Sequence, residues 1–201
     1  AASLAVGGTS LCLVSAHLAA HEGEVAARNA GYHELCRGLL ASAPGGHLLG
    51  HDGVIFAGDL NYRVCLAREV AQTFVQYGEL GKLLQEDQLR AAMARGEAFG
   101  GFREAPLRFA PTFKYDVGAR TYDSSKKQRV PSWCDRVLWR ARGGCRLEPL
   151  DYHRCEVLDS DHRPVVCVLR LSPLGEDPVM APEARRHCEG LVAATAALAG
   201  H

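Results

Sequence analysis

Four short apolar runs, each bordered by or containing polar residues, constrain the fold of this chain most strongly. The runs cover residues 11–16, 54–57, 134–139 and 165–171. None approaches the ~20 residues that a membrane span requires, but each has the length of a buried β-strand. Segments whose apolar residues have helical spacing lie between the first runs. This alternation predicts a layered domain of mixed strands and helices, α/β or α+β.

The segments between and after these runs have different characters. Helical spacing covers 22–40, and it also covers 66–95 with interruptions expected at Gly78 and Gly81. Residues 96–129 are rich in glycine, proline and polar residues, which predicts a loop. We therefore expect one domain over 1–171, followed by a linker and a helical tail over 172–201.

Charge and cysteine content exclude several classes of protein. Lysine plus arginine and aspartate plus glutamate both total 23, so the chain as a whole is not a basic nucleic-acid binder. Nine basic and three acidic residues lie within 108–142, which indicates either a local phosphate partner or a solvated basic face. Eight cysteines without a C-x-x-C pair predict buried free thiols in a reducing compartment. With no signal-peptide pattern, we expect a cytoplasmic protein whose membrane contact is peripheral.

The polar residues after the second run can carry chemistry. Gly58 ends this run, and Asp59 and Asn61 follow it two positions apart. A carboxylate there can accept a proton from water, and an amide can donate a hydrogen bond to a phosphate oxygen. The same four-residue pattern is also typical of a simple turn that leaves a strand.

Charged residues also interrupt the third run and precede the fourth. Asp135 and Arg136 lie in an otherwise apolar strand, which is costly unless they are paired. They form either a buried network with each other or a site in which Asp135 orients a catalytic histidine. Asp161 and His162 precede the last run, and a carboxylate commonly fixes the tautomer of a histidine. A turn with a solvated His162 is the alternative.

These segments together resemble the inositol polyphosphate 5-phosphatases. Residues 56–63 and 131–139 are similar to the two signature motifs of that family, and 15–21, 111–116 and 160–164 are similar to further family segments. The resemblance implies a two-sheet sandwich flanked by helices, as in deoxyribonuclease I and exonuclease III. It also implies that 1–171 is the C-terminal two-thirds of a catalytic domain. The family's metal-binding Glu and a catalytic Asn would lie in the missing N-terminal part.

The resemblance also implies a role for each matching residue in Mg²⁺-dependent hydrolysis. Asp59 would be the general base, Asn61 and His162 would contact the scissile phosphate, and Asp135 would orient His162. Asp161 would support the metal, and His17 would be a further phosphate ligand. The implied substrate-binding residues, most of them on the neighbouring ring phosphate, are Lys114, Tyr115, Lys127, Arg129 and Arg63.

The expected reaction is removal of the 5-phosphate from phosphoinositides, such as phosphatidylinositol 4,5-bisphosphate, or from soluble inositol polyphosphates. Two alternatives remain. One is a phosphoinositide-binding module that is catalytically defective because it lacks the metal-ligand Glu. The other is a nuclease of the same superfamily, against which the Trp133-Cys-Asp-Arg136 motif and the basic pair Lys127 and Arg129 argue.

Overall fold

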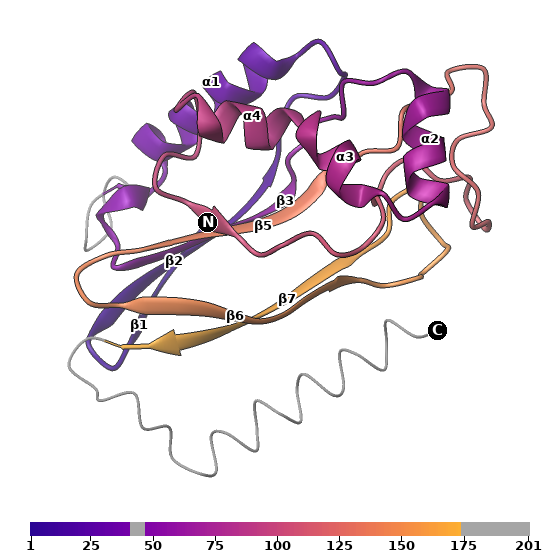
Figure 1. Ribbon diagram of the computed structural model, residues 1–201. Helices are drawn as coiled ribbons and strands as arrows, with labels where there is room; N and C mark the ends of the chain where they lie inside the picture. The colour runs from indigo at the N-terminus through magenta and orange to yellow at the C-terminus, as the bar shows by residue number, and fades with distance from the viewer. Residues whose placement is uncertain (41–46, 174–201) are drawn as a thin grey trace.

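The computed structural model describes residues 1–40 and 47–173. Two β-sheets form its framework (Figure 1). The larger has the strand order β1-β2-β3-β5-β4, in which only β2 and β3 run parallel. The smaller pairs β6 with β7. The strands are β1 (Ala2–Val6), β2 (Thr9–His17), β3 (Gly53–Asp59), β4 (Arg103–Glu104), β5 (Asp135–Ala141), β6 (Arg146–Arg154) and β7 (Val165–Ser172).

The helices are α1 (Val25–Gly38), α2 (Arg68–Gln76), α3 (Leu80–Gln85) and α4 (Gln88–Ala94), with a short 3-10 helix, η1 (Leu48–Gly50). The helices α1 and α4 lie over one face of the larger sheet, and the smaller sheet lies on its other side (Figure 1). The helices α2 and α3 pack in a separate cluster with Trp133 and Tyr152. The expected two-sheet sandwich flanked by helices is therefore confirmed.

The two faces of the larger sheet bury different side chains because direction alternates along a strand. On β3, Val54 and Phe56 pack toward the helices, where Phe56 meets the rings of Tyr32 and Phe99. Ile55 packs toward the smaller sheet. Full burial of each such side chain contributes roughly 1.5–3 kcal/mol, so both layers stabilise the sheet.

All four apolar runs form strands, but three further strands, β1, β4 and β6, were not predicted. All five residues of β1 are exposed, so it carries no apolar periodicity to detect. The β6 strand contains Pro149 and several charged residues, and its register shifts between Pro149 and Asp151. The interruption expected at Gly81 was wrong, because Gly81 lies within α3. The second break comes after Gln85, where Asp87 caps α4 by accepting a hydrogen bond from the backbone of Arg90.

The strand register brings the polar residues of three strands to one edge of the larger sheet. His17 pairs with Asp59 at the ends of the parallel strands β2 and β3. Asp59 also pairs with Asp135 at the start of β5. Residues separated by more than a hundred positions in the sequence therefore become neighbours, and this edge is where the candidate site forms.

The remaining expectations concern thiols, membranes and the tail. Seven cysteines are described and all are free, and five of them are buried. Cys65 is exposed, and Cys188 lies outside the described residues. No helix in 1–40 or 47–173 is both long and apolar enough to cross a bilayer. The predicted helical tail falls almost entirely within 174–201, outside the described residues.

Candidate active site

A cavity of about 460 Å³ opens at the edge of the sheet where β2, β3 and β5 meet. Nine of the eleven residues predicted for the site line it: His17, Asp59, Asn61, Arg63, Lys114, Lys127, Arg129, Asp161 and His162. Asp135 lies directly behind this set, whereas Tyr115 does not reach the cavity. Residues distributed over more than 140 positions thus converge on one hollow.

The end of β3 has a backbone that fixes the direction of Asp59. Gly58 has φ +135°, and a Cβ there would lie 2.1 Å from the carbonyl oxygen of Ala16 on the neighbouring strand. Only glycine fits this close approach. Asn61 follows with φ +57°, a conformation that asparagine tolerates better than most residues. Its backbone N–H donates to Asp59 Oδ1 at 3.0 Å, which holds the carboxylate toward the cavity.

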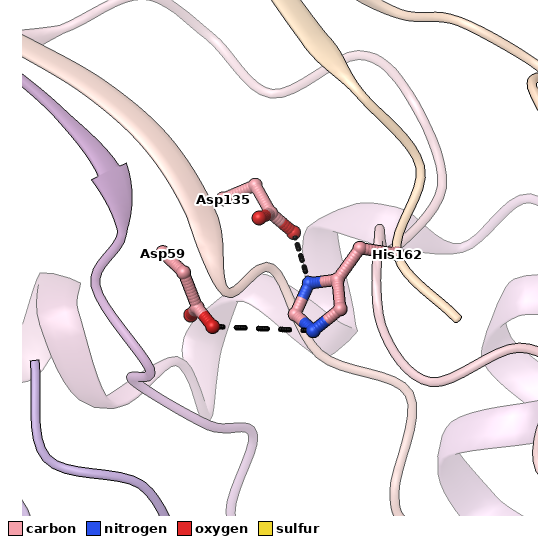
Figure 2. Close-up of side chains that lie close together, drawn as sticks. All are labelled: Asp59, Asp135 and His162. Carbon is pink, nitrogen blue, oxygen red and sulfur yellow. Dashed lines mark hydrogen bonds and ion pairs between the residues drawn. The ribbon is translucent and has the colours of Figure 1, made fainter. Parts of the chain in front are cut away.

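Asp59, Asp135 and His162 form the centre of the site (Figure 2). His162 Nδ1 lies 2.9 Å from Asp135 Oδ2, and His162 Nε2 lies 3.9 Å from Asp59 Oδ2. The hydroxyl of Thr112 donates to the same Asp135 oxygen at 2.6 Å. Since Asp135 accepts at Nδ1, the other ring nitrogen of His162 is left to face the cavity. The alternative of an ion-paired network between Asp135 and Arg136 does not form, because Arg136 pairs with Asp87 and Glu104 instead.

The environment raises the pKa of both Asp59 and His162, which face the cavity. Burial raises the pKa of Asp59, and the nearby Asp135 carboxylate adds to the rise, which His162 and His17 only partly offset. Burial opposes the charged form of His162. The hydrogen bond that His162 donates to Asp135 and the negative charges of Asp135, Asp59 and Asp161 outweigh it, so the pKa of His162 rises above 6.5. A carboxylate that is a stronger base and an imidazole that holds its proton more firmly suit acid–base chemistry.

Asn61 and Arg63 are held rigidly beside this centre. The Asn61 amide donates to the carbonyl of Leu18 at 3.1 Å, and its oxygen accepts a hydrogen bond from the Arg63 guanidinium. Arg63 also stacks over Phe113, with 4.3 Å to the ring centroid. The ring of Phe113 in turn packs against His162 at 4.6 Å between centroids. Arg63 therefore positions both Asn61 and, through Phe113, the catalytic candidate His162.

The basic side of the cavity combines one paired cation with two unpaired ones. Lys114 Nζ lies 2.9 Å from Asp161 Oδ2, and this contact lowers the pKa of Asp161 although burial acts in the opposite direction. Lys127 and Arg129 line the same cavity and form no ion pair with any residue of 1–40 or 47–173. Asp123 holds their loop by accepting the backbone N–H of Arg129 at 2.8 Å.

Tyr115, which was predicted to contact a substrate phosphate, does not line the cavity in the structure. Tyr115 is 3% exposed, and its hydroxyl donates to the carbonyl of Pro111 at 3.0 Å and meets the Tyr122 hydroxyl at 2.7 Å. The guanidinium of Arg163 covers its ring at 3.9 Å. These buried partners turn the side chain away from the cavity. Tyr115 supports the segment that carries Lys114 and does not itself contact the hollow.

Sequence reasoning missed three residues that organise the site. Thr112 and Phe113 lie within the matching segment 111–116, but nothing in their spacing shows that they contact Asp135 and His162. Arg28 is fully buried and donates to the carbonyls of Ala19, His21 and Glu22, which shapes the loop at one wall of the cavity. An arginine near the start of an amphipathic helix gives no signal of such a role.

The acidic centre is compatible with a divalent cation. One ligand atom each from Asp59, Asp135 and His162 lies within 4.8 Å of the others. Carboxylate oxygens suit hard cations, which complete their shells with water or substrate phosphate. The Asp135 oxygen already has two hydrogen-bond partners, so Asp59 is the better-placed ligand of the two aspartates.

Comparison with known proteins agrees with this geometry. The model of the endonuclease/exonuclease/phosphatase family 2 matches residues 1–168. Polyphosphatidylinositol phosphatase INP53 of Saccharomyces cerevisiae is 40% identical over 167 residues, which cover 82% of this chain and 15% of that protein. Synaptojanin of Caenorhabditis elegans is 38% identical over 171 residues, with 84% and 15% covered. The chain thus spans about 15% of the length of these relatives.

Solved structures also share the fold. The inositol polyphosphate 5-phosphatase domain of SPsynaptojanin, in complex with inositol (1,4)-bisphosphate and calcium ion, matches with a TM-score of 0.75 and 32% identity over 92% of this chain and 52% of that one. Cimex nitrophorin, in a ferrous NO complex, matches with a TM-score of 0.70 and 25% identity over 85% and 57%. Because proteins with such different ligands share this fold, the side chains of the site must carry any functional argument.

Proposed function

The chain belongs to the endonuclease/exonuclease/phosphatase family, and we propose that it contributes the catalytic face of a Mg²⁺-dependent inositol polyphosphate 5-phosphatase. The substrate would be a phosphoinositide such as phosphatidylinositol 4,5-bisphosphate, a soluble inositol polyphosphate, or both. One observation carries the proposal. Asp59 and the Asp135–His162 pair share a single cavity with the unpaired cations Lys127 and Arg129. A reactive centre and a phosphate-binding rim are thereby combined.

In this mechanism Asp59 accepts a proton from the attacking water. The water oxygen forms a bond to phosphorus as the bond from phosphorus to the inositol oxygen breaks, and that oxygen takes up a proton. Asp59 suits the role of base because its pKa is raised while its carboxylate remains fixed by the Asn61 backbone. His162 donates from Nε2 to a phosphate oxygen, since its Nδ1 is engaged by Asp135. Asn61 has one amide N–H left for a second such contact.

Asp161 would support Mg²⁺, which when bound would neutralise charge on the phosphate. The chain's own contribution on that side is the ion pair between Lys114 and Asp161, which fixes the direction of this carboxylate. His17 is 3.4 Å from Asp59 and largely exposed at the mouth of the cavity. It is therefore free to contact an incoming phosphate.

Lys127 and Arg129 would bind the phosphate next to the scissile one. Arginine can form two parallel hydrogen bonds with phosphate, and lysine supplies a mobile point charge. Both side chains line the same cavity as Asp59 and His162. A phosphoinositide would present its headgroup there from a membrane surface, so the membrane contact would be peripheral.

The first test is release of inorganic phosphate from vesicles that contain phosphatidylinositol 4,5-bisphosphate, in the presence of Mg²⁺. Asp59→Asn should lower the rate by about 10²–10⁴, the usual contribution of a general base. Asp116→Asn, which changes a carboxylate of the loop after Lys114, is the matched control and should leave the rate near that of the parent. Equal rates for Asp59→Asn and the parent would remove Asp59 as the base.

Specificity gives the second test. Lys127→Ala combined with Arg129→Ala should reduce turnover of substrates that carry the neighbouring phosphate by at least about tenfold, because two charge-assisted contacts are lost. Substrates without that phosphate should lose less. The comparison is a ratio of kcat/KM values for the two substrate types. An equal loss on both would mean that the pair attracts anions only in a general way.

A non-enzymatic phosphoinositide-binding module is the second candidate. One observation favours it: among the described residues, the acidic centre offers only Asp59 as a carboxylate ligand that is not already committed to Thr112 or Lys114. This candidate predicts vesicle binding that depends on Lys127 and Arg129, without phosphate release and without any effect of Asp59→Asn. Cosedimentation with vesicles, carried out beside the release assay, separates the two candidates.

A further inference from the structure

A second polar cavity lies at the opposite end of β5 from the candidate active site. It has a volume of about 420 Å³ and is formed where β4, β5 and β6 come together. Three arginines from these three strands line it: Arg103, Arg140 and Arg146. Glu148 is the one carboxylate on its wall, and Trp139 forms part of its base. The cavity therefore has an excess of positive charge.

None of these three arginines is neutralised by the rest of the described chain. Arg103, Arg140 and Arg146 form no ion pair and no side-chain hydrogen bond with residues in 1–40 or 47–173. Glu148 lies instead 3.9 Å from Arg170 on the neighbouring strand. Arg136, three positions before Trp139 on the same strand, shows the contrast, because it pairs with two carboxylates. Gathering like charges without counter-ions is unfavourable unless an anion joins them.

The backbone makes room for one of these guanidinium groups. Gly101 has φ +77°, and a Cβ at that position would lie 3.3 Å from Arg140 Nε. A side chain there would crowd the guanidinium against the wall of the cavity. Trp139 is 4% exposed and gives the base a rigid surface. Arg140 is thus held in place, whereas Arg103 and Arg146 are exposed at the rim and can adjust to a ligand.

The cavity is separate from the active site. Asp135 stands at the first end of β5, and Ala141, which lines the second cavity, stands at the last. At roughly 3.4 Å per residue, the two ends are about 20 Å apart. A ligand bound at the arginines would therefore not contact Asp59 or His162.

We propose that this cavity, here called the arginine cavity (Arg103, Arg140 and Arg146), binds a compact polyanion with two or more phosphate groups. Guanidinium groups match phosphate geometry by forming paired hydrogen bonds. Arg103 and Arg146, contributed by two strands, can hold separate phosphates of one ligand, and Arg140 adds positive charge nearby. The ligand would be either a free polyphosphorylated small molecule or the headgroup of a polyphosphorylated lipid. This inference does not depend on the proposed phosphatase activity.

The experiment measures binding of inositol hexakisphosphate by calorimetry. The chain carries Lys127→Ala and Arg129→Ala throughout, so that the active-site cavity contributes little. Adding Arg103→Gln and Arg146→Gln should weaken binding at least about tenfold, because two charge-assisted contacts are removed. Both side chains are exposed, so their loss leaves no buried gap. The matched control, Arg90→Gln with Arg108→Gln, removes the same charge from exposed positions elsewhere and should have little effect.

Two outcomes would overturn the proposal. One is equal binding before and after the substitutions at Arg103 and Arg146. The other is an equal loss in the control pair, which would reveal general electrostatic attraction. A second arm repeats the comparison by cosedimentation with phosphatidylcholine vesicles, with and without phosphatidylinositol 4,5-bisphosphate. Loss of vesicle binding in the Arg103/Arg146 variant alone identifies the lipid headgroup as a ligand. Loss confined to the soluble probe identifies the free polyphosphate.

Discussion

Asp135 and Arg136 are neighbours on β5, yet they belong to different parts of the molecule. Asp135 is half-buried and lies behind the residues that line the active-site cavity, where it meets His162. Arg136 points to the other side of the strand and is 1% exposed, paired with Asp87 and Glu104. The alternation of side chains along a strand separates the two charges. The comparison teaches that one motif can contain both a functional charge and a structural charge.

The buried ion pairs of Arg136 with Asp87 and Glu104 hold several elements together. The guanidinium of Arg136 contacts both oxygens of Asp87, at 3.1 and 3.0 Å, and Asp87 also caps α4. Its other nitrogens bind Glu104 at 2.7 and 2.6 Å, and Glu104 accepts a further hydrogen bond from Tyr152. Burial opposes the charge of Arg136, but the two carboxylates outweigh it and raise its pKa well above the ordinary value. At the active site, by contrast, burial and the neighbouring Asp135 raise the pKa of the Asp59 carboxylate.

Removing Arg136 should give the largest effect on folding. Arg136→Met leaves Asp87 and Glu104 buried without a counter-charge, so we expect a loss of about 3–5 kcal/mol in the free energy of unfolding. Urea denaturation followed by circular dichroism measures it. Asp135→Asn, one residue away, serves as the control and should shift the midpoint far less. Similar shifts for the two variants would mean that the division between functional and structural charge is wrong.

Asp135→Asn should instead affect turnover. An amide at this position cannot stabilise a charged His162 as a carboxylate does, and residues that orient a functional imidazole typically contribute about 10–100-fold. Phosphate release should fall by that factor while the unfolding midpoint changes little. A normal rate would show that His162 needs no orienting carboxylate, and it would weaken the proposed mechanism.

The protonation of His162 provides a pH test in the metal-free protein. Its pKa is raised above 6.5 in the folded state, so its protonation stabilises the fold. This stability is fully present below pH 6.5, the unfolded value, and is lost as the pH rises through the folded pKa. An NMR titration of the imidazole should place the midpoint above 6.5, and Asp135→Asn should move it down. A midpoint that Asp135→Asn leaves in place would contradict the assigned hydrogen bond.

The smallest expected effect concerns Thr112. Thr112→Val removes the hydroxyl that donates to Asp135 at 2.6 Å while keeping a similar shape. We expect a loss of about 1 kcal/mol in stability, typical of one hydrogen bond, and a fall in turnover smaller than that of Asp135→Asn. Combining the two substitutions tests their coupling, because contacts in one network are not additive. Strict additivity would show that Thr112 acts independently of Asp135.

The sequence was most informative where apolar periodicity was strong. It predicted β2, β3 and β5 at the centre of the larger sheet, β7 of the smaller sheet, and the long helix α1. It missed β1, which is exposed throughout, the two-residue β4, and β6, which contains Pro149. It also put a helix break at Gly81, where the packing of Leu80, Leu83 and Leu84 keeps α3 intact. Tertiary packing overrides a weak local signal in each case.

The candidate site likewise has features that the sequence predicted and features that only the tertiary structure revealed. The sequence by itself determined which functional groups are available, because Asp59, Asn61, Asp135 and His162 lie in ordered motifs at strand ends. Only the tertiary structure decided which partners they meet. Tyr115 turned into the core, Arg136 paired with Asp87 and Glu104, and Thr112 and Phe113 became the neighbours of Asp135 and His162. The physical reason is that local spacing fixes the face of a strand on which a side chain lies, whereas strand register and packing determine what lies opposite it.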